Sequence, residues 1–154
     1  MSRVHQVAVP ARAREIAALN RVEYADCFAV DVSAERTPEE WIRLVAGAMP
    51  ALFLVVRGAH RVLGLRLAPA DSPQHVIGWD VLRSAADEAV LSNAGMLGQP
   101  RIAALTQPGE VVVATLIEFN GIIGRILWAA AAPMHRAVTR YALSTLATLA
   151  AENA

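Results

Sequence analysis

Three titratable side chains of this sequence have neighbours that could give them a chemical role. The first is His135, which follows Pro133 and precedes Arg136 in an Ala- and Leu-rich segment that favours helix. Because a histidine titrates near neutral pH, His135 could serve as a general base or as a polar handle for a ligand. The structural alternative is an imidazole bonded to the backbone carbonyl that Pro133 leaves without a donor. The sequence leaves both interpretations open.

Asp26 is the second candidate. It shares one face of a predicted strand, residues 22–32, with Tyr24 and Phe28. If this face points inward, Asp26 is a buried carboxylate, which is costly and therefore typical of a functional site. If the strand lies at an exposed edge, Asp26 is an ordinary surface residue.

Glu118 is the third candidate. It lies just before Asn120-Gly121, where the predicted strand ends, and Arg125 lies just after. The two charged side chains could hold the polar head group of a ligand. They could equally form a salt bridge that holds the corner between a strand and a helix, and this second interpretation is favoured.

Other constellations that carry chemistry are absent from the sequence. The four histidines, His5, His60, His75 and His135, are scattered, so no metal site is expected. There is no P-loop, no GxGxxG and no GxSxG, and no cofactor is expected. Cys27, the only cysteine, has no cationic neighbour that would favour a reactive thiolate.

The elements that must position these residues begin with a clear helix start. Thr37-Pro38-Glu39-Glu40 is a capping box with proline at the first helical position, and it predicts a helix over residues 37–48. Met49-Pro50 ends or kinks this helix. Residues 51–56 then resume in helical or extended form, and residues 68–74 form a loop.

The second half of the chain is predicted to be an antiparallel meander. Its strands are expected at residues 76–83, 88–93, 101–106 and 111–119. Turns are expected at residues 84–87 and 107–110, the second because Pro108-Gly109 suits the centre of a turn. The last strand is apolar on both faces, so it should be central and covered.

A long helix is predicted from Ile122 to about Ala151. Its spacing suggests that one face carries Leu127, Ala131, Met134, Val138, Tyr141, Thr145 and Leu149. Arg125, Arg136 and Arg140 would then lie on the opposite face.

Composition limits the class of protein. The chain has 154 residues, which suits a single domain with a weakly patterned lead-in over residues 1–20. Its 14 basic and 14 acidic residues cancel, which argues against a nucleic-acid partner. The single cysteine and the lack of an apolar leader favour a cytoplasmic location. The apolar stretch 111–134 is interrupted by charged residues, so no transmembrane segment is expected.

The order of these elements resembles the helix-grip fold of the START/Bet v 1-like (SRPBCC) superfamily. More narrowly, the second half is similar to the DUF2867 family, through Thr115–Asn120, Gly124-Arg125 and Pro133–Arg136. The resemblance implies an α+β fold: a curved antiparallel sheet wrapped around a long C-terminal helix, with two short helices after the first strand. It implies a ligand-binding scaffold and brings no established catalytic residues.

The sequence supports two hypotheses of function from different classes, and a third without a ligand. The leading hypothesis is binding of a small apolar or amphipathic molecule between sheet and final helix, with walls from Trp79, Val81, Val113, Thr115, Leu127, Met134, Val138 and Tyr141. Which alternate set of strand residues faces inward is open, because a one-residue shift exchanges the sets. The alternative is a cyclase, dehydratase or hydrolase on the same scaffold, using Asp26, Glu118 or His135. A third option is a homodimer interface without a ligand.

Overall fold

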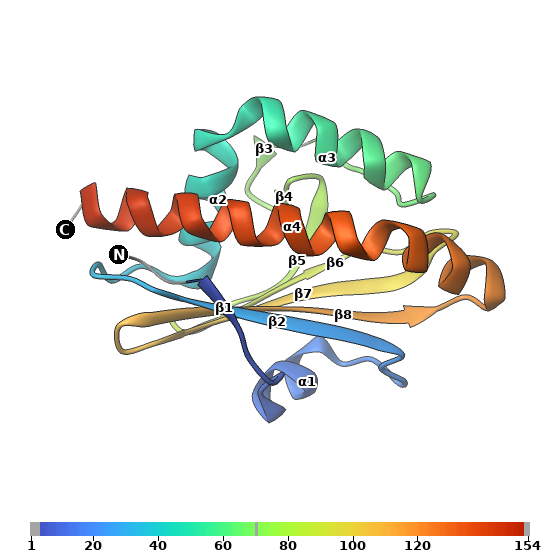
Figure 1. Cartoon of the computed structure of the whole chain (residues 1–154), viewed down its shortest axis with the longest axis horizontal. Helices are drawn as coiled ribbons and strands as arrows, with labels where there is room; N and C mark the ends of the chain where they lie inside the picture. Colours follow the sequence, from blue (N-terminus) through green and yellow to red (C-terminus); the bar gives the residue numbers. More distant parts are fainter. Residues whose placement is uncertain (1–3, 70, 153–154) are drawn as a thin grey trace.

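One antiparallel sheet of eight strands carries the fold, and the longest helix lies across one of its faces (Figure 1). The computed structural model describes residues 4–69 and 71–152. In sheet order the strands are β1 (Val4–Gln6), β2 (Tyr24–Asp31), β8 (Glu110–Phe119), β7 (Gly98–Gln107), β6 (Glu88–Ser92), β5 (Trp79–Ser84), β4 (His75–Val76) and β3 (Asp71–Ser72). The helices are α1 (Ala11–Ala17), α2 (Pro38–Ala48), α3 (Pro50–Val62) and α4 (Ile122–Glu152).

This arrangement confirms the predicted helix-grip fold. From β2 onward the chain runs through two helices and a meander of strands to α4, which packs on the sheet beside α2 and α3. The two short helices follow β2, the strand predicted at residues 22–32, and a further short strand, β1, precedes it in the chain. The N-terminal lead-in contains β1 and α1, which the weak sequence pattern did not reveal.

The lead-in covers the face of the sheet opposite α4. β1 pairs with β2 and extends the edge of the sheet, while α1 lies beneath it (Figure 1). Ala13 and Ala17 of α1 are fully buried against the apolar side chains of the strands. Two alanines give little periodic signal, which is why this helix was not recognised from the sequence.

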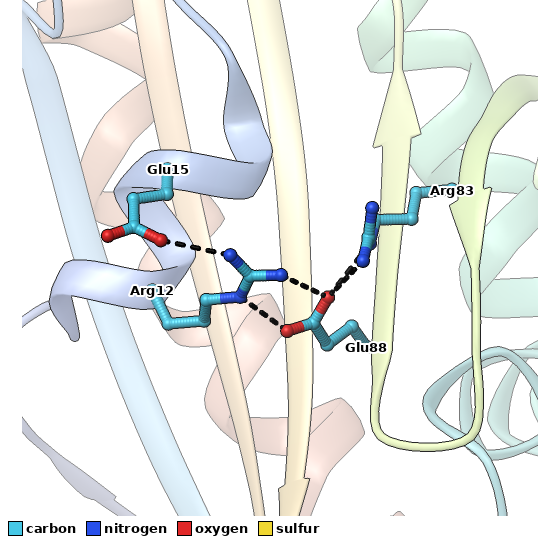
Figure 2. A network of polar contacts seen from close by, with 4 residues as sticks. All are labelled: Arg12, Glu15, Arg83 and Glu88. Atoms are coloured by element: carbon cyan, nitrogen blue, oxygen red, sulfur yellow. Dashed lines mark hydrogen bonds and ion pairs between the residues drawn. The ribbon is translucent and has the colours of Figure 1, made fainter.

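A network of charged side chains ties α1 to the sheet (Figure 2). Arg12 of α1 donates two hydrogen bonds to the carboxylate of Glu88 on β6 and a third to Glu15. Arg83 of β5 also donates to Glu88, at 2.8 Å. These bonds, led by the two from Arg12, hold the pKa of Glu88 below its usual range. Glu88 is therefore ionised at neutral pH and links α1 to two strands.

The helix start predicted at Thr37 is confirmed. The Thr37 hydroxyl accepts from the Glu40 backbone N–H at 3.2 Å, and the Glu40 carboxylate accepts from the Thr37 N–H at 2.8 Å. The helix ends before Pro50, where α3 starts at an angle of 103° to α2. Proline at the first position of α3 needs no hydrogen-bond partner, so one residue both ends a helix and begins another.

The segment predicted as one strand, 76–83, is a hairpin. Val76 pairs with Trp79, and the two residues between them, Ile77 and Gly78, have φ values of 51° and 85°. Such a two-residue turn normally carries Asn or Gly, because a β-branched residue is strained at positive φ. The Ile77 side chain is buried in the core, which accounts for its place in the turn.

β8 is covered on both faces, as its apolar pattern predicted. It pairs with β2 on one side and with β7 on the other. Thr115, Ile117 and Phe119 point toward α4, while Ala114 and Leu116 point toward α1. In β2 the corresponding alternation places Tyr24, Asp26 and Phe28 on the α4 side.

The predicted buried face of α4 is wrong. Met134 and Tyr141 are 68% and 60% exposed, and the helix buries Gly124, Trp128, Ala132, Leu143, Leu146, Ala147 and Ala150. Arg136 and Arg140, expected on the outer face, reach Tyr24 and the ring of Phe28 on β2. Apolar residues surround the whole helix, so the sequence pattern could not select a face. An error of one residue rotates that face by about 100°.

No single helix within residues 4–69 and 71–152 is long and apolar enough to cross a membrane. The pair α2 and α3 passes the test of length and composition only when joined across its 103° bend.

Candidate functional site

A cluster of polar side chains lies between the sheet and the middle of α4. Asp26 on β2 and Thr115 on β8 are direct cross-strand partners. Both are 4% exposed, and both point toward His135 on α4. The Nε2 atom of His135 lies 3.1 Å from the Thr115 hydroxyl and 3.4 Å from Asp26 Oδ2. The structure therefore brings together two of the three titratable candidates, from positions 109 residues apart in the sequence (135 − 26).

Tyr24 and Arg136 complete the cluster on its β2 side. The Tyr24 hydroxyl donates to Asp26 Oδ2 at 2.6 Å and accepts from Arg136 Nη1 at 3.3 Å. Burial, together with the hydrogen bond to Asp26, raises the pKa of Tyr24 to about 12. Tyr24 therefore remains a neutral hydrogen-bond donor to the carboxylate at neutral pH.

The cluster also determines where His135 carries its proton. A carboxylate accepts hydrogen bonds and cannot donate them, so Asp26 favours the tautomer with hydrogen on Nε2. The Nε2–H group then faces both Asp26 Oδ2 and the Thr115 hydroxyl oxygen. The lone pair of the neutral ring is left on Nδ1.

Two buried polar atoms next to His135 lack a hydrogen-bond partner within the described part of the chain. One is the second carboxylate oxygen of Asp26, Oδ1, and the other is Nε1 of Trp128. The Trp128 ring contacts the His135 ring, with centroids 4.9 Å apart, and meets Tyr24 edge-on at 5.2 Å. Unsatisfied buried polar atoms are rare in folded proteins and often mark functional sites.

A small cavity of about 40 Å³ opens beside this cluster. Thr115, His135 and Trp128 form part of its wall, while Asp26 lies behind them and does not reach it. Its other walls are mainly apolar and come from α3, the strands and their connections: His60, Leu63, Leu65, Trp79, Leu97, Pro100, Ile102 and Ile117. About 10–15 Å³ of such space is enough for one water molecule, so the cavity has room for only a few.

His60 closes the cavity from the α3 side. The indole N–H of Trp79 donates to His60 Nδ1 at 3.2 Å, which places the histidine's own hydrogen on Nε2. Burial lowers the pKa of His60 to about 4, and the nearby charges of His135 and Arg57 act in the same direction. His60 is therefore neutral at physiological pH.

A larger apolar groove lies further toward the N-terminal end of α3. It has a volume of about 410 Å³ and is lined by Arg43, Ala46, Gly47, Pro50, Phe53, Leu54, Arg57, Val76 and Ile77. α3 and the β3–β5 segment contribute residues to both the groove and the cavity. A third, more polar groove of about 490 Å³ near Trp41 contains none of the cluster residues.

Glu118 does not belong to the cluster. It points to the opposite face of the sheet, where its carboxylate accepts from the backbone N–H of Arg21 at 3.0 Å. The expected salt bridge between Glu118 and Arg125 is also wrong, because Arg125 pairs with Glu23. The sequence pattern could not identify Glu23 as the partner, since it lies just before β2 and is remote from Arg125 in the chain.

The eight predicted lining residues divide into three groups. Trp79 and Thr115 line the cavity. Val81 and Leu127 pack against the same core cluster, and Val113 packs against the neighbouring one. Val138 is half-buried, whereas Met134 and Tyr141 are exposed, because the helix is rotated relative to the expected face.

Eight of the residues that line the cavity escaped the sequence analysis, among them the polar side chains of Trp128 and His60. Trp128 lies seven residues before His135, a spacing that returns to the same face of a helix after about two turns, and this signal could have identified it. Nothing in the sequence links His60 to the site.

A second polar row joins the short strands β3, β4 and β5. Ser72 Oγ lies 2.7 Å from His75 Nδ1, and His75 Nε2 lies 3.1 Å from an Asp80 carboxylate whose side chain is 70% exposed. The three residues are successive cross-strand partners, so the row is accounted for by the pairing of these strands. Across residues 4–69 and 71–152, no three His, Cys, Asp or Glu side chains are grouped so that they could hold a metal ion.

Comparison with known proteins gives one match. The model of a family described as "Protein of unknown function (DUF2867)" matches residues 18–142. That segment includes Asp26, Thr115, His135 and the whole wall of the cavity. No curated protein and no solved structure matches the chain.

Proposed function

The chain belongs to the DUF2867 family, whose function is unknown, and from its site we propose that it binds a small apolar or amphipathic molecule between the sheet and α4. The single observation that carries this proposal is the apolar cavity with a polar corner at Thr115 and His135. The helix-grip architecture also supports a place in the START/Bet v 1-like (SRPBCC) superfamily.

The composition of the walls suits such a ligand. Trp79, Trp128 and several aliphatic side chains would contact a flat apolar body, while His135 and Thr115 would orient one polar group. The unpartnered Nε1–H of Trp128 is a donor, so an oxygen atom on the ligand would satisfy it.

The ligand requires more room than the cavity of about 40 Å³ provides, because ligand sites usually measure roughly 300–1,000 Å³. α3 is the element best able to provide it. No residue of α3 is fully buried, and the helix lines both the cavity and the groove of about 410 Å³. Outward movement of α3 would join the two spaces, and we propose this as the route of entry.

A fluorescent naphthalene sulfonate tests the proposal, since its emission rises in an apolar site. Wild-type protein should bind the probe saturably. Thr115→Leu should weaken binding at least tenfold, because the larger side chain fills the cavity and removes the hydroxyl. The matched control is Val113→Leu, which enlarges a residue on the same face of β8 outside the cavity and should bind as wild type does.

A further variant separates the cavity from the outer surface. Met134→Ser removes an exposed apolar side chain from α4 and should leave probe binding unchanged. Loss of binding in Met134→Ser, with retention in Thr115→Leu, would place the probe on the outside of the helix and contradict the proposal. The exposed apolar residues of α4 would then support a homodimer interface as the better interpretation.

A further inference from the structure

We infer that this cavity also catalyses proton transfer, with the His135 imidazole as a general base acting through Nδ1 and Asp26 as the positioning residue behind it. The inference rests on the proposed function, because the substrate must enter the space between α4 and the sheet. It goes further in assigning a reaction and a substrate class: apolar carbonyl compounds with a hydrogen on the carbon next to the carbonyl.

The geometry around His135 leaves one nitrogen for chemistry. Nε2 is held between Asp26 Oδ2 at 3.4 Å and Thr115 Oγ1 at 3.1 Å. Nδ1 forms no hydrogen bond with any residue that the structure describes, and His135 lines the cavity. A histidine fixed at one nitrogen by a buried carboxylate, with the other nitrogen available, has the arrangement of a general base.

Asp26 supplies the charge that such a base needs when it becomes protonated. Its carboxylate is buried, and Oδ1 has no partner, so its interaction with an imidazolium is little screened by solvent. The other ionisable groups packed around the pair are Tyr24 on β2, Arg136 on α4 and His60 on α3. Tyr24 and His60 are neutral at pH 7, which leaves Arg136 as the opposing charge, and it contacts the Tyr24 hydroxyl rather than His135.

The remaining polar groups of the wall suit a carbonyl oxygen. Because Nε2–H donates to a lone pair of Thr115 Oγ1, the Thr115 hydroxyl hydrogen takes no part in that bond and can donate to the substrate. The buried Nε1–H of Trp128 is a second donor without a partner. Two neutral donors would stabilise the negative charge that develops on a carbonyl oxygen when the adjacent carbon loses a proton.

Proton abstraction from the substrate needs no co-reactant. The C–H bond next to the carbonyl breaks, its hydrogen forms an N–H bond at His135 Nδ1, and the electron pair moves to give an enolate. The imidazolium then returns the proton to the same carbon or to another position of the conjugated system. If the N–H hydrogen exchanges with water first, return to the same carbon introduces a solvent hydrogen there, and return elsewhere isomerises the substrate.

Hydrogen exchange measured by proton NMR in D₂O tests the inference, with β-tetralone as a small flat aryl ketone. Wild-type protein should accelerate loss of the signal from the hydrogens beside the carbonyl, and the naphthalene sulfonate probe should inhibit this exchange. His135→Gln should lower the protein-dependent rate about a hundredfold, the contribution typical of a general base. His5→Gln alters a histidine on β1, outside the cavity, and should exchange as wild type does.

Asp26→Asn tests the positioning role by separating rate from binding. Removal of the negative charge should lower the protein-dependent exchange rate, because the imidazolium loses its counter-charge, while β-tetralone should displace the probe as it does from wild type. A purely structural role for Asp26 would weaken displacement of the probe together with the rate. If this buried substitution prevents folding, Thr115→Val provides the second variant, with a reduced exchange rate expected because one donor to the carbonyl oxygen is lost.

The outcomes separate the two proposals. If β-tetralone displaces the fluorescent probe but exchanges no faster than in buffer, ligand binding stands and proton transfer is overturned. If the probe binds and β-tetralone does not displace it, the carbonyl substrate class is overturned. If neither compound binds, the proposed function fails and the inference fails with it.

Discussion

At the scale of single residues, the site combines two histidines in opposite settings. His135 faces a carboxylate, whereas His60 accepts a hydrogen bond from the Trp79 indole and has no acidic partner among the described residues. Burial lowers the pKa of His60 to about 4. The neutral form of His60 is therefore part of the folded state, and its protonation should oppose folding.

This difference predicts a pH-dependent stability that belongs to His60. In the unfolded chain a histidine binds its proton near pH 6.5, while folded His60 binds one only near pH 4. Between these values the unfolded state holds more protons, so stability should fall as pH decreases from about 6.5 to 4. His60→Asn, which retains an acceptor near the position of Nδ1, should show a smaller fall in the urea midpoint across this range. Parallel curves for the two proteins would contradict the assignment.

At the scale of elements, the start of α4 depends on a close approach to the connection between β6 and β7. A Cβ atom at Gly124 would meet the backbone carbonyl oxygen of Leu97 well inside van der Waals contact. Gly58, in α3, is exposed and would meet nothing within 4 Å. The two helical glycines therefore serve different purposes, which helix propensity alone cannot distinguish.

The two glycines should respond in opposite directions to alanine. Gly58→Ala should stabilise the protein by about 0.5–1 kcal/mol, because alanine favours helix and nothing obstructs its methyl group. Gly124→Ala should destabilise it by about 1–3 kcal/mol, since the helix must shift away from Leu97. Urea unfolding of both variants measures these changes. Stabilisation by both substitutions would show that α4 does not pack closely on Leu97.

At the scale of the whole molecule, the two faces of the sheet are covered differently. On one face α1 is attached by buried alanines and by the Arg12–Glu88 bonds (Figure 2). On the other face α4 buries residues along most of its length, while α3 buries none completely and exposes Leu54, Val55 and Val62. α3 is thus the helix with the least packing to lose on moving.

Hydrogen exchange measured by mass spectrometry should reveal this movement. Amides of α3 should exchange faster than those of β8, because elements with few buried contacts open at a lower free energy. A saturating concentration of the naphthalene sulfonate should slow exchange in α3 and leave α1 unchanged, since α1 lies on the far face. Equal protection of α3 and β8 in the free protein would argue against α3 as the route of entry.

The sequence by itself determined the features that depend on near neighbours in the chain. The capping box at Thr37, the turn at Pro108-Gly109 and the two-sided apolar pattern of β8 are each local, and each is present in the structure. The alternation in β2 placed Asp26 on the same face as Tyr24 and Phe28. Their order along the chain was sufficient to indicate the helix-grip fold.

Only the tertiary structure decided which of these features meet. The approach of His135 to Asp26 and Thr115 depends on the rotation of α4, and a helix that is apolar all round carries no local signal for that rotation. The pairing of Arg125 with Glu23 and the turn at Ile77 likewise follow from packing between segments remote in the sequence. Hydrogen-bond capping and strand alternation act within a few residues, whereas a buried site forms where long-range packing brings separate elements together.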